Sequence, residues 1–349
     1  MEYSFLGKSG LEVSRLSFGA ATFGFPTSAD VAVGNIGVVE TKEACRLIGL
    51  CRDAGVTYFD TADVYSTGDS EKILGEALKP YRKDIALGTK TTMPMGTGSF
   101  DRGASRRHIV QSCEDSLRRL GTDWIDLFQL HYPDYLVPAE ETMRALDDLV
   151  RDGKVRYVGC SNYSGWHMMR SLAASDTLGI ERFVSHQMCY SLIDRDAENE
   201  LIPAALDQGV GLMAWGPLSG GFLSGKYRRG EPLPKGSRFE ALPNYPPPAN
   251  PELAYNVLDV LREIAEKRER TVGDVALNWV LRRPWIDTLI LGARTEQQLV
   301  ANLKAMEWSL GEDEFNSLEK ASQTPLPYPN RIQRMINADR TPPIPAYRP

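Results

Sequence analysis

Residues 57–90, TYFDTADVYSTGDSEKILGEALKPYRKDIALGTK, contain the pattern that decides the fold. Thr57–Phe59 and Ile85–Gly88 are short apolar runs, as expected of strands that are buried on both faces. Between them, Glu71–Lys79 carries apolar residues at the spacing of an amphipathic helix. A strand, a helix and a second strand in this order form a β–α–β unit, in which the two strands are parallel.

The same alternation continues along most of the chain. Helical patterns occupy Arg106–Leu120, Ala139–Val150 and Asn199–Gln208, and the first of these has apolar residues at three- and four-residue steps. Eight alternating units favour an α/β fold of the closed (β/α)8 (TIM) barrel type over an open, doubly wound sheet. The eight strand candidates are Val13–Phe18, Thr57–Phe59, Ile85–Gly88, Trp124–Leu130, Tyr157–Gly159, Phe183–Ser185, Gly211–Ala214 and Thr288–Leu291.

The N-terminal segment predicts a β-hairpin. Tyr3–Leu6 and Val13–Phe18 are extended runs on either side of the glycine-containing turn Gly7-Lys8-Ser9-Gly10. We expect this hairpin to close the bottom of the barrel. No long linker or charge run divides the chain, so residues 1–349 are predicted to form a single domain.

Composition narrows the possible partners and the location. A net charge of −6 argues against nucleic acid as the main partner. No secretory signal or long apolar stretch is present, so we expect no membrane span. The odd number of cysteines, without a CxxC pair, predicts reduced thiols, no metal site and a cytoplasmic protein. Of these cysteines, only Cys160 is expected near the chemistry.

Three segments interrupt the alternation of predicted strands and helices. They are the insertion at 25–41, the Gly- and Pro-rich segment at 218–250, and the Pro-rich tail at 324–349. Long irregular loops of this kind are usually functional or disordered. The sequence assigns no role to the insertion or to the tail.

Polar residues follow several of the apolar runs. Asp60 and Tyr65 follow the second strand candidate, Lys90 the third and His131 the fourth. The C-terminal ends of barrel strands form the active-site face, so these side chains should converge. A buried lysine needs a carboxylate partner, and Asp60 can supply it. The lysine should lower the pKa of a neighbouring tyrosine, which can then exchange a proton with a substrate oxygen.

These residues belong to motifs that resemble those of the aldo-keto reductase family. The matching segments are Asp60-Thr61-Ala62-Asp63-Val64-Tyr65, Lys90, Leu130-His131-Tyr132-Pro133-Asp134, Gly159-Cys160-Ser161-Asn162 and Gly292-Ala293-Arg294-Thr295. The resemblance implies a hydride transfer between a nicotinamide cofactor and a carbonyl or alcohol. In that reaction Tyr65 would be the general acid or base, Lys90 and Asp60 would assist it, and His131 would orient the substrate.

The resemblance also implies a cofactor site. Ser161, Asn162 and Gln187 would hold the nicotinamide carboxamide, and Trp215 would stack on its ring. An arginine beside a helix N-terminus suits the 2′-phosphate of NADP, although NAD remains open. The chain has no GxGxxG motif after its first strand, which argues against a Rossmann domain. The remaining cofactor candidates are Gly19, Ala20, Gly216, Pro217, Leu218, Gly220, Gly292, Arg294, Thr295, Gln298 and Asn302.

Other interpretations of the same residues stay open. Asp60 alone could cap a turn, His131 and Trp215 could belong to the core, and Arg294 could be a solvated residue at a helix start. A cofactor-sensing regulatory subunit without significant turnover is the alternative function. A barrel isomerase or aldolase, with Lys90 as a base or Schiff-base amine, is a third. The substrate, the preferred direction and the oligomeric state cannot be predicted from the sequence.

Overall fold

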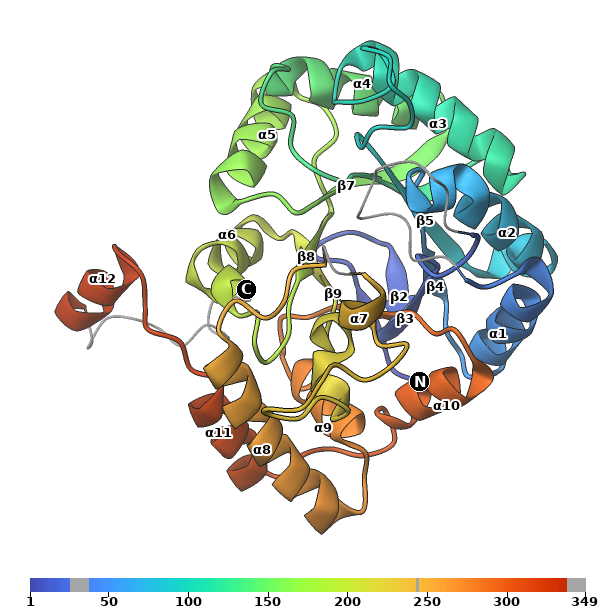
Figure 1. Ribbon diagram of the computed structural model, residues 1–349. Helices are drawn as coiled ribbons and strands as arrows, with labels where there is room; N and C mark the ends of the chain where they lie inside the picture. Colours follow the sequence, from blue (N-terminus) through green and yellow to red (C-terminus); the bar gives the residue numbers. More distant parts are fainter. Residues whose placement is uncertain (26–37, 243–244, 338–349) are drawn as a thin grey trace.

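The computed structural model describes residues 1–25, 38–242 and 245–337, and it confirms the (β/α)8 barrel (Figure 1). Eight parallel strands close in the order β10-β3-β4-β5-β6-β7-β8-β9, so every strand has two neighbours and no edge is left open. Their bounds are β3 Leu16–Gly19, β4 Tyr58–Asp60, β5 Ala86–Thr91, β6 Ile125–Leu130, β7 Val155–Ser161, β8 Ser185–Cys189, β9 Gly211–Trp215 and β10 Thr288–Leu291.

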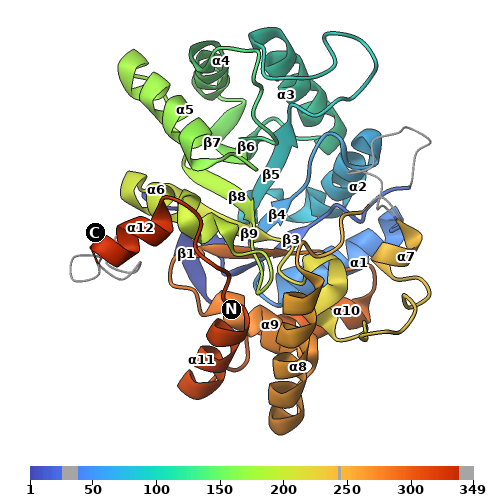
Figure 2. The ribbon, with the colours of Figure 1, turned by 60° about the vertical axis from the view of Figure 1, so that its left-hand side comes forward.

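Helices surround the strands, and both ribbon views show α3, α4 and α5 on the side of the barrel opposite α8 and α11 (Figures 1 and 2). Helix α3 keeps the predicted bounds Arg106–Leu120, because the Ser105 hydroxyl caps its first turn and Gly121 ends it in the left-handed conformation. The other α-helices are α1 Thr41–Asp53, α2 Asp69–Leu78, α4 Ala139–Arg151, α5 Gly165–Leu178, α6 Leu201–Gln208, α7 Arg238–Ala241, α8 Pro251–Arg268, α9 Val272–Leu281, α10 Glu296–Lys304, α11 Glu312–Ala321 and α12 Asn330–Ile336. Among the described residues, none of these helices is both long enough and apolar enough to cross a membrane.

The barrel interior changes from apolar to polar along its axis. Side chains alternate along a strand, so one set packs against the helices while the other faces the barrel interior. Tyr58, Leu127 and Met213 form an inner apolar cluster with Leu6 of the N-terminal segment. Two residues further along their strands, the inward positions are Asp60, Gln129 and Trp215. The packed lower half therefore supports a polar upper end.

The hairpin of β1 (Tyr3–Phe5) and β2 (Glu12–Ser14) lies at the bottom of the barrel, as predicted. The Gly7 and Lys8 N–H groups donate hydrogen bonds to the Asp287 carboxylate and the Gly209 carbonyl, which precede β10 and β9. Gly7 has a φ of 55°, and a Cβ there would come within 2.3 Å of the Gly209 oxygen. Only glycine fits this contact.

Some predicted boundaries were wrong. Val13–Phe18 is two strands, because the chain turns at Arg15, whose N–H pairs with Glu2 in the hairpin while its guanidinium reaches the Leu281 carbonyl. The sixth barrel strand begins at Ser185, where the prediction ended it. Its polar residues His186 and Gln187 had indicated a strand end, but they lie within the strand.

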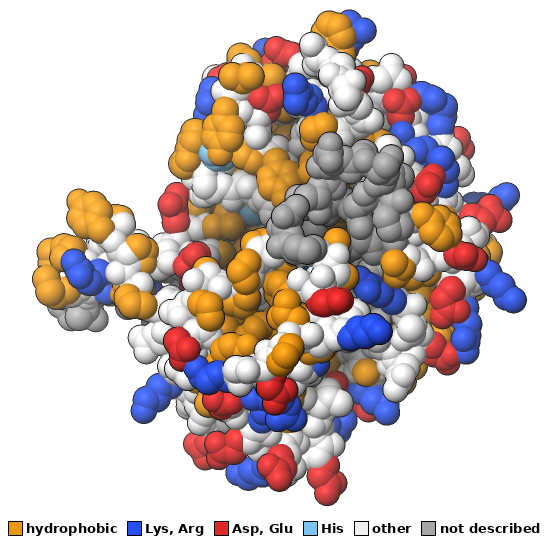
Figure 3. All heavy atoms as spheres, in the orientation of Figure 1, with side chains coloured by type: hydrophobic (Ala, Val, Ile, Leu, Met, Phe, Trp, Pro, Cys, Tyr) orange, Lys and Arg blue, Asp and Glu red, His pale blue; other side chains and the backbone are white. Residues whose placement is uncertain are grey.

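The irregular segments contain more structure than predicted. The 218–250 segment includes a 3-10 helix, η4 (Ser219–Ser224), and the short helix α7. The tail contains α12, which stands off from the helical ring in Figure 1. Figure 3 shows apolar side chains on this projection, where Met335 and Ile336 are 70% and 66% exposed. Most of the 25–41 insertion and the last twelve residues, 338–349, lie outside the described residues.

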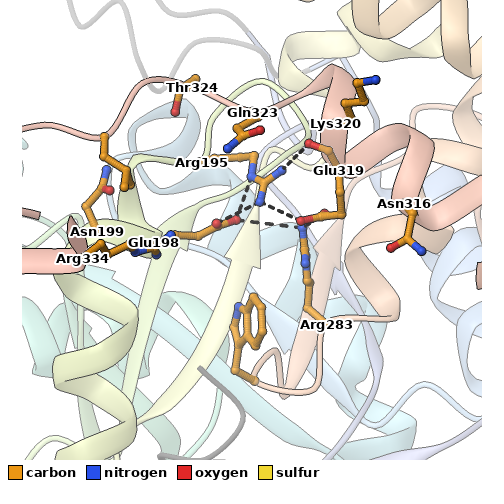
Figure 4. Close-up of a pocket in the computed structure, with 12 residues that line it drawn as sticks. Arg195, Glu198, Asn199, Arg283, Asn316, Glu319, Lys320, Gln323, Thr324 and Arg334 are labelled. Carbon is orange, nitrogen blue, oxygen red and sulfur yellow. Dashed lines mark hydrogen bonds and ion pairs between the residues drawn. The ribbon is translucent and has the colours of Figure 1, made fainter. Parts of the chain in front are cut away.

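A cavity of about 470 Å³ lies outside the barrel, beside α11 and the short helix η3 (Asp196–Asn199) (Figure 4). Its charged walls are largely paired with each other. Arg195 contacts Glu198 at 2.8 Å and Glu319 at 3.0 Å, and Arg283 forms an ion pair with Glu319. This network of ion pairs ties α11 to the barrel connections. The cavity is therefore a structural junction.

Candidate active site

The structure brings Lys90 and Asp60 together, as predicted. Lys90 Nζ lies 2.5 Å from Asp60 Oδ2 and also donates a hydrogen bond to the Thr61 carbonyl at 2.7 Å. The Lys90 side chain is completely buried. Burial lowers the Lys90 pKa, but the charges of Asp60 and then Tyr65 outweigh it, so the pKa is raised overall. The ammonium therefore stays charged at the closed end of the site.

Three further donors surround the other oxygen of Asp60. Oδ1 accepts hydrogen bonds from Tyr58 Oη at 3.2 Å, Gln129 Nε2 at 3.1 Å and Gln187 Nε2 at 3.0 Å. Sequence analysis missed the roles of Tyr58 and Gln129. The signal was the period of two: Tyr58 is the inward position before Asp60, and Gln129 faces inward from β6. Gln187 was predicted to hold a nicotinamide carboxamide, and its amide nitrogen is bonded to Asp60.

Tyr65 lies at the start of a 3-10 turn, η1 (Tyr65–Gly68), after β4. Lys90 Nζ is 5.2 Å from the centre of its ring. Burial raises the Tyr65 pKa, and this outweighs the charge of Lys90, which lowers it. The predicted fall in pKa was therefore wrong, because burial could not be judged from the motif. The phenol is protonated at neutral pH and can donate a proton.

His131 faces Tyr65 edge to ring, with ring centres 5.7 Å apart. Burial, and then the charge of Lys90, lowers the pKa of His131 well below its ordinary value of 6.5. The imidazole is therefore neutral. Its side chain makes no hydrogen bond with the described residues, and its other face stacks on Tyr132 at 5.3 Å. A ring nitrogen remains free to bind a substrate oxygen.

Asn162 organises one wall of the site. Its φ of 56° is left-handed, a conformation that asparagine tolerates better than most residues. Its N–H donates to the Gln187 carbonyl at 3.0 Å, and Nδ2 donates to Ser161 Oγ at 3.0 Å. Oδ1 accepts a hydrogen bond from Trp215 Nε1 at 3.2 Å. The three predicted residues Ser161, Asn162 and Trp215 thus form one connected surface with a fixed indole ring.

A glycine-rich loop follows Trp215. Gly216, Gly220 and Gly221 have φ values of 68°, 63° and 90°, in the left-handed region that glycine adopts without strain. Within the loop, Ser219 N–H donates to the Gly216 carbonyl at 2.7 Å, and Gly221 N–H to the Leu218 carbonyl at 2.9 Å. Such a loop can approach a pyrophosphate closely. Pro217 lies between Gly216 and Leu218, whose carbonyls accept these two hydrogen bonds.

Three cations gather beyond the glycine loop. Burial lowers the pKa of both Lys226 and Arg294, and the positive charge of Arg238 lowers both further. None of the three forms an ion pair with a described residue. Like charges gathered without a carboxylate are typical of an anion site. Sequence analysis found only Arg294, because Lys226 and Arg238 lie in the segment read as irregular.

The other predicted cofactor residues lie around the start of α10. Thr295 Oγ1 accepts the Gln298 N–H at 3.3 Å, and Gln298 Oε1 accepts the Arg294 N–H at 2.8 Å. Asn302 Nδ2 lies 3.4 Å from the Gly292 carbonyl. A Cβ on Gly292 would come within 3.2 Å of the Gly19 carbonyl, so β10 and β3 end close together. The Ala20 N–H donates to the Asp60 carbonyl at 2.8 Å.

The prediction about Cys160 was wrong. Cys160 is fully buried and belongs to the apolar layer between strands and helices. It points outward because it alternates with the inward-facing Ser161. Cys189 lies nearer the chemistry: it pairs with Trp215 in the register of β8 and β9, and its Sγ would lie 3.6 Å from a Cβ on Gly216.

The sequence model of the Aldo/keto reductase family matches residues 15–323. A probable voltage-gated potassium channel subunit beta of Arabidopsis thaliana is 38% identical over 315 residues, which cover 88% of this chain and 92% of that protein. The uncharacterized oxidoreductase YrpG of Bacillus subtilis is 36% identical over 90% of this chain and 93% of its own length. The L-glyceraldehyde 3-phosphate reductase of Escherichia coli is 31% identical over 88% of each chain.

These matches and the barrel define the class: the chain belongs to the aldo/keto reductase family. Its relatives include both named oxidoreductases and named channel subunits. Family membership supports nicotinamide-dependent oxidoreduction as the general chemistry.

Proposed function

We propose that the protein is an NADP(H)-dependent oxidoreductase that reduces an aldehyde or ketone, or oxidises the corresponding alcohol. The observation that carries this proposal is the arrangement of a protonated Tyr65 beside the buried Lys90–Asp60 pair and a neutral His131. Trp215 offers a flat wall for a nicotinamide ring at the same barrel end. The substrate of the protein would be a small carbonyl compound or alcohol.

The described residues divide the work of proton transfer. When bound, the cofactor supplies or accepts the hydride. Tyr65 Oη donates a proton to the carbonyl oxygen during reduction and takes it back during oxidation. Lys90, held by Asp60, stabilises the phenolate that forms as the proton leaves. A ring N–H of His131 donates a hydrogen bond to the same substrate oxygen and orients it.

The cationic group favours NADP(H) over NAD(H). Lys226, Arg238 and Arg294 crowd positive charge where described carboxylates do not balance it. A 2′-phosphate would neutralise part of that charge, and NAD(H) lacks this group. The five free thiols fit a reducing compartment, and we place the protein in the cytoplasm.

The test is NADPH consumption with a panel of aldehydes and ketones, using wild type, Tyr65→Phe and Tyr81→Phe. Tyr81 lies outside the barrel against Arg52, so its variant controls for loss of a phenol elsewhere. We expect Tyr65→Phe to lose at least about 100-fold in kcat, in line with the usual contribution of general acid catalysis, while cofactor binding persists. Equal activity of the three proteins would refute the role of Tyr65.

A second function is favoured by the similarity to the channel subunits, which extends over 88% of the chain. In that case the same barrel would bind the cofactor as a regulatory subunit, without significant turnover. Tight NADPH binding together with no consumption across the panel would support this function over the enzyme. Measurable hydride transfer that requires Tyr65 would exclude it.

A further inference from the structure

The loop that carries Tyr65 is strained. Ser66 and Thr67 have φ values of 48° and 51°, and Gly68 has a φ of 91°. Two consecutive non-glycine residues in the left-handed region are unfavourable and persist only where the surroundings hold them. The strands fix Asp60 and Lys90, but Tyr65 lies beyond β4, on this loop. Its position therefore depends on what packs under the loop.

Arg119 of α3 packs directly under the loop. A Cβ on Gly68 would lie 2.7 Å from Arg119 Cδ, so the two surfaces are in close contact. Arg119 Nε donates to Glu71 Oε2 at 2.6 Å, and Glu71 Oε1 accepts the Thr89 hydroxyl at 2.6 Å. Glu71 and Thr89 are completely buried. This chain of contacts joins α3, the start of α2 and the residue before Lys90.

Asp63 forms a second link, two residues before Tyr65. Its N–H donates to the Lys90 carbonyl at 3.0 Å, and its Oδ2 accepts the Ser112 hydroxyl of α3 at 3.0 Å. Oδ1 is buried and has no hydrogen-bond partner among the described residues. The charged groups that act on it are Glu71 from α2 and Arg119 from α3. Neither Asp63 nor Ser112 is needed for the proton transfer described above.

We propose that Asp63–Ser112 and Glu71–Arg119 act together as positioning residues that hold the strained Tyr65 loop against Lys90. Together these two pairs form the α3 clamp. The proposal extends the proposed function, since it specifies how the proton donor is kept in place. A cluster that only stabilised the fold would give variants with a general loss of stability. A clamp for Tyr65 predicts instead a loss confined to this loop and to the proton-transfer step.

Neighbouring arginines on α3 provide a matched pair of variants. Arg119→Gln removes the contact with Gly68 and Glu71, whereas Arg118→Gln removes an exposed arginine that pairs with Asp115 on the same helix. We expect Arg119→Gln to lower kcat about tenfold or more, the scale at which geometric misplacement acts, with the NADPH Kd changed less than about twofold. Arg118→Gln should match the wild type in both measurements.

Hydrogen exchange gives a readout that does not depend on turnover. The Tyr65 and Thr67 N–H groups donate to the Ala62 and Val64 carbonyls at 3.2 and 3.1 Å, so their exchange rates report the loop directly. We expect a peptide covering residues 62–70 to exchange faster in Arg119→Gln and at the wild-type rate in Arg118→Gln. Unchanged exchange and unchanged kcat in Arg119→Gln would overturn the clamp. Faster exchange throughout the barrel would also overturn it, because the role would then be structural.

Asp63 variants complete the test. Burial, and then Glu71, raises the Asp63 pKa to about 7, so ionisation places a second buried negative charge beside Glu71. We therefore expect wild-type kcat to decline above pH 7, as this repulsion loosens the loop. Asn keeps the shape and the acceptor for Ser112 but cannot ionise, so Asp63→Asn should keep the low-pH kcat and show no such decline. Asp63→Ala should lower kcat at every pH. Ser112→Ala, the smallest change, serves if Arg119→Gln does not fold. An absence of wild-type turnover would refute the proposed function, while the exchange result would still decide the clamp.

Discussion

Replacing Arg238 with glutamine should have two effects of opposite sign. In the cationic group, Arg238 lowers the pKa of both Lys226 and Arg294, so it repels them. Removing it relieves that repulsion, and the free protein should become slightly more stable. The same change removes a donor for the proposed 2′-phosphate, and NADPH should bind more weakly. A side chain kept only for folding would not combine these effects.

The magnitudes can be worked from the contacts. A hydrogen bond to a charged group contributes about 1.5–3 kcal/mol, which corresponds to roughly a 10- to 150-fold increase in the NADPH Kd. The NADH Kd should change less than about twofold, because NADH has no 2′-phosphate. The repulsion among partly exposed cations is screened by solvent, so the gain in stability should stay below about 1 kcal/mol.

The assay is fluorescence titration with NADPH and NADH at fixed ionic strength, combined with urea unfolding in the absence of cofactor. Lys235→Gln is the control, since Lys235 is an exposed cation three residues away that does not act on either Lys226 or Arg294. Equal changes in the two cofactor affinities would refute the phosphate assignment. A less stable free protein would refute the repulsion argument.

Three further predictions concern the catalytic end. Lys90→Met leaves the Asp60 carboxylate buried without its counter-ion, so the free energy of unfolding should fall by about 3–5 kcal/mol in urea unfolding at pH 7. An unchanged free energy of unfolding would contradict the importance of this ion pair. Because the His131 pKa is lowered in the folded chain, a fall in pH protonates this side chain first in the unfolded chain. The contribution of the neutral imidazole to the free energy of unfolding is therefore complete above the unfolded pKa of about 6.5 and is lost as pH falls. His131→Gln should therefore lose less stability than wild type between pH 7 and pH 5, and parallel urea midpoints would count against burial as the cause. Trp215→Ala should weaken the binding of NADPH and NADH by similar factors, about tenfold if stacking contributes about 1–1.5 kcal/mol. A loss of NADPH affinity alone would contradict the placement of Trp215 against the nicotinamide.

Much of the fold could be predicted because burial imposes a pattern on the sequence. Arg106–Leu120 was predicted to the residue, since its face period, cap and terminal glycine all agree. The start of β8 was missed because His186 and Gln187 are polar, and polarity was taken as the end of a strand. In the upper barrel, however, both faces of β8 carry polar side chains: Gln187 faces inward and bonds to Asp60, whereas His186 faces outward and bonds to the Tyr163 carbonyl.

The site could be predicted only as far as chain order places it. Asp60 and Lys90 lie at the C-terminal ends of β4 and β5, His131 directly follows β6, and the barrel brings strand ends together whatever the loops do. Lys226 and Arg238 lie instead in the segment after β9, where no periodic pattern indicates which side chains meet. The sign of the Tyr65 pKa shift was missed for a related reason. It depends on burial by surrounding loops, and a motif contains only the nearby charge.

The geometry separates two demands on this site. Lys90 and Asp60 are costly to bury, so they are held by several barrel strands that supply Gln129 and Gln187 as further donors. Tyr65 must gain and lose a proton, and it lies on a short strained loop beyond the end of β4, where the Asp63 N–H bonds to the Lys90 carbonyl of β5. The rigid barrel alone therefore cannot set the distance over which the proton moves. That distance depends on α3, a helix outside the barrel, which makes α3 the element where substitutions far from the substrate should alter kcat without altering cofactor affinity.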